Sequence, residues 1–260
     1  MDIFHAIILA FINGFTEFLP VSSTGHMFMA VQLMQLRQDE FYKIFQIALQ
    51  MGAMVAIVLV FWRTFLLDWE IDAKLMAAFV PSAVIGLLIY KLIKHTLLGN
   101  AWVIVWAWFI GGAFMILVER FYPMKNRIKE VKKIGFSEAI IIGSCQALGV
   151  IPGVSGLAAT VFGGFMLGIE RKTIVEFSFL LGLPTLFSLT VYDVVKADAS
   201  SLTSDQWIML LFGFLVSFLV AWGTIKFLVH YIQRHNFTAF GVYRVIIALA
   251  AGLYLNLLLS

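Results

Sequence analysis

The polar residues between positions 13 and 27 have the types and spacing of a reaction site. The stretch reads NGFTEFLPVSSTGHM, and the ten residues 17–26 within it bring together one carboxylate, three hydroxyls and one imidazole: Glu17, Ser22, Ser23, Thr24 and His26. Its flanks are almost wholly apolar, and an ionisable side chain at membrane depth costs about 3 kcal/mol, so it is rare there without a partner or a function. These side chains are the groups of nucleophilic and acid–base catalysis.

Pro20 divides this stretch into two limbs. Proline lacks a backbone donor and restricts the preceding Leu19, so a helix over residues 12–19 is expected to end or bend there. Three cap-type residues follow, and then a second apolar run over residues 27–34. A broken helix is tolerated in a bilayer only where protein covers the loosened backbone or the backbone lines a wet cavity.

The start of the second limb is suited to bind an anion, because its free amides carry partial positive charge. A phosphate group is the expected ligand, with Ser22, Ser23 or Thr24 as its ligand or nucleophile. Glu17 or His26 would serve as the base. The alternative is a kinked transmembrane helix whose serines bond their own backbone.

The composition places these residues in a membrane. Of the 260 residues, 62% are hydrophobic and 13% are charged, and the mean hydropathy is +0.96. Apolar runs of about twenty residues recur, which is the length that crosses roughly 30 Å of hydrocarbon. The net charge of +3 lies in loops, so nucleic-acid binding is not expected. The lone Cys145 excludes a disulfide framework, and Asp2 stands where a cleavable signal peptide would be basic.

Two similar halves follow from the hydropathy pattern. Full spans are expected at residues 44–61, 75–92, 102–118, 175–191, 207–227 and 239–258, and a charged loop at 62–74. A second interrupted segment has limbs at 136–151 and 156–167, with a break at Pro152. Each half therefore has one interrupted segment and three spans, and the two breaks are expected to face each other near the midplane.

The most basic segment, residues 119–135, is expected to be a cytoplasmic linker. With it inside, the four loops of that side carry twelve of the 18 Lys and Arg residues, and the opposite side carries five. This orientation requires both interrupted segments to be re-entrant, and three spans per half then make the halves antiparallel. The prediction is an all-α polytopic membrane protein with an inverted-topology repeat, six transmembrane helices and two re-entrant helical hairpins. The repeats cover 1–124 and 136–260, joined by a linker at 125–135.

Four motifs resemble one bacterial family. They are TEFLPVSSTGH, PGVS followed by AAT at Ala158–Thr160, EFSFLL at Glu176–Leu181 and VYR at Val242–Arg244. In this order they are similar to the undecaprenyl pyrophosphate phosphatases, the bacitracin-resistance family, over nearly the whole chain. The resemblance implies a hydrolase that converts the polyprenyl diphosphate carrier of cell-wall and surface glycans to its monophosphate.

The resemblance also implies the setting of this activity. The protein would lie in the bacterial plasma (inner) membrane as a multi-pass protein, with its site facing the periplasm or the outside. A divalent cation, Mg²⁺ or Ca²⁺, would assist. The expected partners are the polyprenyl diphosphate and the membrane lipids, and a homodimer stays open.

Site roles carry over from the family residue by residue. Ser23 would be the nucleophile or a phosphate ligand, Glu17 an acidic partner and metal ligand, and His26 a proton acceptor or donor. The substrate-binding positions that the resemblance implies are Asn13, Ser22, Thr24, Gln50, Gly153, Ser155 and Thr160.

The chain departs from the family pattern at four positions. Asn13 and Gln46 stand where carboxylates are usual, and Gly156 and Leu157 stand where the family has arginine and serine. Losing an arginine fork on a phosphate commonly costs roughly 10² to 10³ in rate, by analogy with oxyanion-hole donors. The alternative function is therefore a catalytically impaired homologue that binds or translocates a polyprenyl phosphate. Another Lys or Arg, or the cation, could also replace the missing arginine.

Arg244 lies inside the last expected span. An intramembrane arginine needs a partner, so it is expected either to neutralise a carboxylate such as Glu176 or to bond backbone carbonyls. This structural role is favoured over contact with the substrate phosphate.

Overall fold

The computed structural model describes residues 1–93, 97, 99–122, 127–198, 200 and 202–259. Within these residues every regular element is a helix, and six helices are long and apolar enough to cross a membrane. These six are α3 (Glu40–Leu67), α4 (Trp69–Ile93), α5 (Ala101–Phe121), α8 (Arg171–Lys196), α9 (Ser204–Tyr231) and α10 (Thr238–Leu259). The predicted all-α polytopic class is confirmed.

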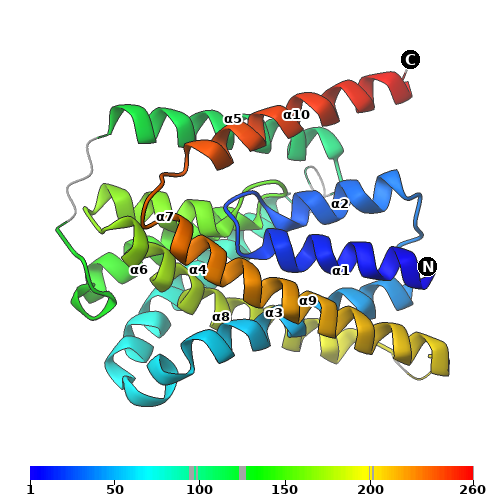
Figure 1. Cartoon of the computed structure of the whole chain (residues 1–260), viewed down its shortest axis with the longest axis horizontal. Helices are drawn as coiled ribbons and strands as arrows, with labels where there is room; N and C mark the ends of the chain where they lie inside the picture. Colours follow the sequence, from blue (N-terminus) through cyan, green and yellow to red (C-terminus); the bar gives the residue numbers. More distant parts are fainter. Residues whose placement is uncertain (94–96, 98, 123–126, 199, 201, 260) are drawn as a thin grey trace.

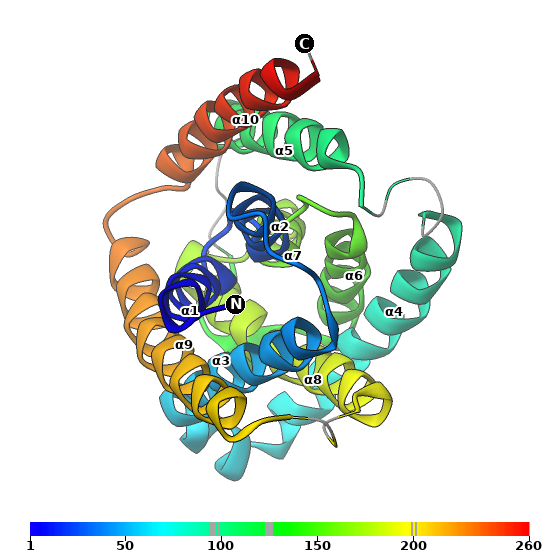
Figure 2. The same cartoon turned by 90° about the vertical axis from the view of Figure 1, so that its right-hand side faces the viewer.

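Four shorter helices form two hairpins. They are α1 (Ile3–Glu17) with α2 (Ser23–Leu33), and α6 (Phe136–Gln146) with α7 (Gly156–Met166), where the 3₁₀ turn Ala147–Val150 extends α6. Helices of 11 to 15 residues are about 17 to 23 Å long, too short to cross roughly 30 Å of hydrocarbon. The two hairpins enter from opposite ends of the bundle (Figure 1) and are surrounded by the long helices (Figure 2).

The helix contacts follow an inverted repeat. In each half the first limb of the hairpin packs on the middle span of the other half, so α1 contacts α9 and α6 contacts α4. A glycine allows each close approach: a Cβ on Gly14 would lie 2.6 Å from the Ser217 carbonyl oxygen, and one on Gly143 would lie 1.9 Å from that of Ala78. The helices α5 and α10 pair across the same pseudo-symmetry. The expected boundary at 124/125 lies outside the described residues.

The prediction of a loop at residues 62–74 is wrong. Helix α3 continues to Leu67 and α4 begins at Trp69, so the chain is helical up to a break at Asp68. The charges of this segment support helix instead of ending it, because acidic residues in a first turn favour the helix dipole and Lys74 pairs with Glu70 four residues away at 2.7 Å. A kink at Phe61 marks where the apolar span bends.

The basic linker is held against the corner between α3 and α4. The Lys132 ammonium lies 2.5 Å from the Asp68 carboxylate and holds the pKa of that carboxyl below its usual range. The Lys74 ammonium donates to the Lys132 carbonyl oxygen at 2.7 Å. Beside this corner, residue Ile128 forms an isolated parallel bridge with Ile169. The part of the linker that the structure describes, residues 127–135, is therefore packed at this end of the bundle.

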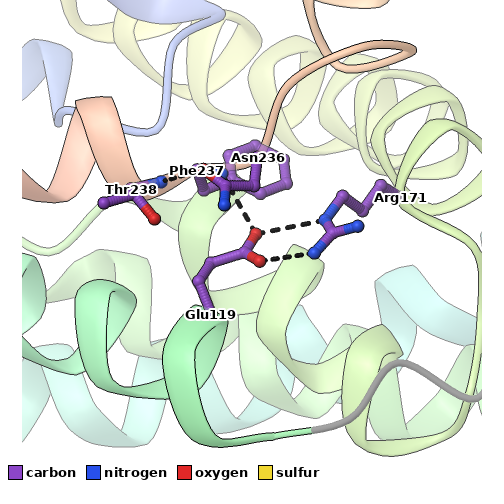
Figure 3. Close-up of polar contacts among 5 residues, drawn as sticks. All are labelled: Glu119, Arg171, Asn236, Phe237 and Thr238. Carbon is purple, nitrogen blue, oxygen red and sulfur yellow. Dashed lines mark hydrogen bonds and ion pairs between the residues drawn. The ribbon is translucent and has the colours of Figure 1, made fainter.

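A buried ion pair joins the two halves at the same end (Figure 3). The side chain of Glu119, at the end of α5, is fully buried and contacts Arg171 of α8 through Nη2 at 2.5 Å and Nε at 3.2 Å. The same carboxylate accepts a hydrogen bond from the Phe237 amide at 3.0 Å. This bidentate contact fixes α5, α8 and the segment before α10 relative to one another.

Candidate active site

The tip of the first hairpin contains a strained turn. Ser22 has φ 72° and ψ 96°, a positive φ that residues with a side chain rarely adopt. Its hydroxyl caps α2 by accepting from the Gly25 amide at 3.4 Å, and it lies 3.1 Å from the Thr24 hydroxyl. The cap makes α2 begin at Ser23 and not near Met27 as the apolar run alone indicated. Such strain persists only where surrounding contacts hold it, and it gathers at functional sites.

Glu17 and Ser23 meet across this tip. Glu17 is the last residue of α1 and Ser23 is the first residue of α2. The Glu17 carboxylate interacts with the Ser23 hydroxyl, and both residues are half-buried. A hydroxyl at a helix N-terminus beside a carboxylate can be deprotonated as it attacks an anion held by the free amides.

His26 has a defined hydrogen-bonding state. Its Nδ1 lies 2.8 Å from the Ser22 carbonyl oxygen, and its Nε2 lies 2.7 Å from the Tyr243 hydroxyl. A carbonyl oxygen can only accept, so Nδ1 carries the hydrogen, and Nε2 of the neutral ring then accepts from Tyr243. In the sequence, Tyr243 is marked only as part of the VYR motif at Val242–Arg244. Because the two residues are 217 positions apart, no local pattern links Tyr243 to His26.

Arg244 of α10 connects both hairpin tips. Its guanidinium is 2% exposed and donates to three carbonyl oxygens: Pro20 at 3.4 Å, Gly153 at 3.0 Å and Ala107 at 2.8 Å. The expectation that Arg244 bonds backbone carbonyls is confirmed. Glu176, the other expected partner, lies 3.7 Å from Lys172. The two tips are therefore close enough for one guanidinium group to bond both.

The second hairpin supplies its own polar groups. Ser155 caps α7 by accepting from the Ala158 amide at 3.2 Å, and it is 4% exposed. The Thr160 hydroxyl donates within α7, to the carbonyl oxygens of Gly156 and Leu157. Gly153 has φ 86°, which favours glycine. Ser155 and Gly153 thus lie at the tip, whereas the Thr160 hydroxyl is engaged within its own helix.

Asn13 is tied to the neighbouring span. Its amide donates to the Ser217 hydroxyl at 3.2 Å, and that hydroxyl donates to the Leu49 carbonyl oxygen at 2.8 Å. The usual family carboxylate could not donate this bond, so the amide here joins α1 to α9. Gln50 follows Leu49 on α3 and is half-buried, with no hydrogen bond among those found in the described part of the chain.

The second hairpin repeats this arrangement with Gln146. Its side-chain oxygen accepts from the Ser82 hydroxyl of α4 at 2.8 Å and from the Thr185 hydroxyl of α8 at 3.1 Å. In both halves an amide in the first limb of the hairpin bonds a serine in the middle span of the other half. Gln46, the other amide in place of a carboxylate, is exposed and interacts with Tyr42.

An apolar groove of about 800 Å³ runs between α5 and the α6–α7 hairpin. Its walls include Trp106, Ile110 and Phe162. Ser155 and Arg244 are its polar residues at the hairpin tips, and Cys145 also lines it. The groove therefore leads along apolar side chains of α5 and the second hairpin to the polar groups at the hairpin tips.

No group of three His, Cys, Asp or Glu side chains that could hold a metal occurs among the residues that the structure describes. Glu17 is the carboxylate at the first tip. Magnesium is commonly bound by one or two carboxylates together with substrate phosphates. The residues present fit a cation that the protein shares with a bound phosphate, and they do not form a complete protein site.

The fold and site define a class: multi-pass membrane proteins whose polar groups gather at two re-entrant hairpin tips. Residues 6–250 match the family described as bacitracin resistance protein BacA, and the chain belongs to that family. It is 40% identical over 259 residues to a protein of Wolinella succinogenes named undecaprenyl-diphosphatase, covering 99% of this chain and 100% of that one. Proteins of the same name from Campylobacter jejuni (41% over 248 residues, covering 95% and 92%) and Aquifex aeolicus (36% over 249 residues, covering 96% and 97%) are similarly close.

Proposed function

We propose that this protein is an undecaprenyl-diphosphate phosphatase, which hydrolyses the lipid-carrier diphosphate to the monophosphate. The observation that carries the proposal is the placement of Glu17, the last residue of α1, and Ser23, the first residue of α2, on the two sides of one tight turn. That arrangement offers a nucleophile, a base and free amides for a phosphate in one place. The name shared by full-length relatives supports the same activity.

In the first step Ser23 attacks the terminal phosphorus. Its proton passes to the Glu17 carboxylate, an oxygen–phosphorus bond forms, and the bond from that phosphorus to the bridging oxygen breaks. The polyprenyl monophosphate leaves with the electron pair. Water then attacks the phosphoserine: its proton passes to Nε2 of His26, a new oxygen–phosphorus bond forms and the bond from phosphorus to Oγ of Ser23 breaks. The serine oxygen takes back the proton that Glu17 holds, and inorganic phosphate leaves. Glu17 and His26 thus each act as the base of one step.

The groove supports a lipid as the substrate. Its lining along α5 extends from Asn100 to Met115, about 22 Å at the rise of an α-helix, and it is almost wholly apolar. One end of a prenyl chain can lie there with its diphosphate beside Ser155 and the first tip. Glu17 with the substrate's phosphate oxygens would hold a divalent cation, which when bound would neutralise phosphate charge.

The charge distribution supports a site that opens to the periplasm or the outside. Twelve of the 18 Lys and Arg residues belong to the four sequence segments assigned to the side of the basic linker, 62–74, 119–135, 168–174 and 226–238, and segments rich in Lys and Arg stay cytoplasmic. The first hairpin enters from the opposite end of the bundle (Figure 1).

Phosphate release from undecaprenyl diphosphate tests the proposal. Purified protein with Mg²⁺ or Ca²⁺ is expected to release one phosphate per lipid and to stop when a chelator removes the cation. Release that does not depend on protein concentration would contradict an enzymatic function.

The second candidate function is a homologue that binds or moves a polyprenyl phosphate without turnover. The bond from Asn13 to Ser217 favours it, because that amide can neither accept a proton nor bind a cation as a carboxylate does. Saturable binding of the monophosphate by a folded protein that releases no phosphate would identify this function.

A Gly156→Arg substitution is expected to raise phosphate release by about tenfold or more, because an arginine fork binds a transferring phosphate. The position has room: a Cβ there would meet Gln146 at 3.8 Å and Gly149 at 4.0 Å, which are ordinary contacts. Initial rates at saturating lipid measure the effect. Gly156→Gln is the matched control without charge, and an unchanged rate in a stable Gly156→Arg protein would contradict the prediction.

Cys145 reports on occupancy of the groove, since it is the single cysteine of the chain. Undecaprenyl monophosphate is expected to slow its labelling by a membrane-permeant maleimide severalfold, whereas inorganic phosphate leaves the rate unchanged. Mass spectrometry of the intact protein measures the labelled fraction. In the control, Cys145→Ala combined with Ile140→Cys puts the thiol on an exposed position of α6, where no protection is expected. Equal labelling of Cys145 with and without lipid would contradict the chain's placement in the groove.

A further inference from the structure

The ring of His26 is held by the first hairpin and by Trp108 of α5. Its Nδ1 donates to the Ser22 carbonyl oxygen, which the strained backbone of Ser22 turns toward it. The buried indole of Trp108 lies 4.9 Å from its centroid and also packs against Gly25, where a Cβ would come within 2.8 Å of that indole. These contacts leave Nε2 as the ring nitrogen that is free of the hairpin.

Tyr243 occupies that nitrogen from another helix. Its hydroxyl lies 2.7 Å from Nε2, and the two ring planes are within 7° of each other with centroids 5.7 Å apart. The two rings are therefore nearly parallel, and 2.7 Å is an ordinary length for a hydrogen bond from a hydroxyl. Tyr243 is 42% exposed, so the rest of the chain does not enclose it.

We propose that Tyr243 positions His26 in the tautomer whose Nε2 is unprotonated and relays to that nitrogen the proton of the attacking water. This inference rests on the proposed phosphatase function. A tyrosine hydroxyl can both donate and accept. Before the step it donates to Nε2. When the attacking water gives its proton to the tyrosine oxygen, the tyrosine's own O–H bond breaks and that proton forms the N–H bond at Nε2. The hydroxyl is thereby restored and accepts from the new N–H.

Helix α10 thus contacts both His26 and the backbone of the two hairpin tips. Tyr243 and Arg244 are consecutive residues of α10. Tyr243 holds the imidazole of the first hairpin, while Arg244 holds the carbonyl oxygens of both tips. Tyr243 and Arg244 therefore connect the base, His26, to the backbone of the hairpin tips, where the phosphate is proposed to bind.

Kinetics of Tyr243→Phe test the proposal, because this change removes only the hydroxyl. The turnover number is expected to fall about 5- to 10-fold, the loss of one hydrogen bond, with KM changed less than twofold. Tyr254→Phe on the same helix is the matched control and is expected to keep the parent rate. An unchanged turnover number in Tyr243→Phe would overturn the proposal.

A double-mutant cycle separates positioning from direct substrate contact. In a His26→Gln background, adding Tyr243→Phe is expected to cause no further loss of turnover, since Tyr243 acts through His26. Losses that multiply would mean that Tyr243 contacts the substrate itself, and the proposal would fall.

A spectroscopic measurement decides the matter even if the protein releases no phosphate. In protein with ¹⁵N-labelled histidine, the His26 signals are those missing from His26→Gln. The parent is expected to show a protonated Nδ1 and a hydrogen-bonded, unprotonated Nε2. In Tyr243→Phe the Nε2 signal is expected to move toward that of an unbonded nitrogen. A parent with protonated Nε2, or a signal that does not move, overturns the positioning role, whereas absent turnover with the expected signals refutes only the phosphatase function.

Discussion

Ser23→Ala is expected to reduce phosphate release by about 10³-fold or more, because removal of a nucleophile leaves only binding and charge stabilisation. Ser23 is the first residue of α2, and its hydroxyl is the group that Glu17 contacts. The substitution keeps the fold, since alanine favours helix and the cap of α2 is the hydroxyl of Ser22. Steady-state phosphate release from undecaprenyl diphosphate measures the loss.

Two comparisons make this result specific. Ser22→Ala removes the cap instead and is expected to lower the free energy of unfolding by about 1 kcal/mol, which Ser23→Ala does not. Ser188→Ala changes an exposed hydroxyl that bonds within its own helix, and it is expected to leave both rate and stability unchanged. Residual release in Ser23→Ala within tenfold of the parent would mean that Ser23 only binds phosphate and that water attacks directly.

Arg244→Met is expected to destabilise the protein by about 3 kcal/mol or more and to abolish turnover. The change leaves the carbonyl oxygens of Pro20, Gly153 and Ala107 without their donor. Hydrogen bonds to charged groups contribute about 1.5 to 3 kcal/mol each, and a buried carbonyl left unpaired costs about 1 to 3 kcal/mol. Both hairpin tips lose the group that holds them together, so the phosphate-binding backbone loses its geometry as well.

Thermal unfolding in detergent, followed by tryptophan fluorescence, measures this loss. Arg244→Lys is the graded variant: one ammonium keeps the charge but lacks the planar fork, so an intermediate midpoint is expected. Arg234→Met removes an exposed arginine and serves as the control. An Arg244→Met protein with the parent's unfolding midpoint and turnover would show that the tips are held by other contacts.

The sequence by itself determined the membrane class, the six spans and the two interrupted segments. These features are local, because the length of an apolar run and a proline within it act on neighbouring residues. The first motif also indicated its own chemistry, since Glu17, Ser23 and His26 lie within a few residues of one tight turn. At residues 62–74 the prediction of a loop is wrong, because charged residues also occur in helices. Here the pairing of Glu70 with Lys74 and the acidic first turn of α4 stabilise a helix.

Only the tertiary structure decided what holds this chemistry in place. The Tyr243 hydroxyl on His26, the Arg244 guanidinium on the carbonyls of Pro20 and Gly153, and the Asn13 bond to Ser217 each join residues between 91 and 224 positions apart. Carbonyl acceptors belong to every residue type, so no side-chain pattern marks them in advance. These partners become defined once the inverted halves pack and bring both hairpin tips against α10.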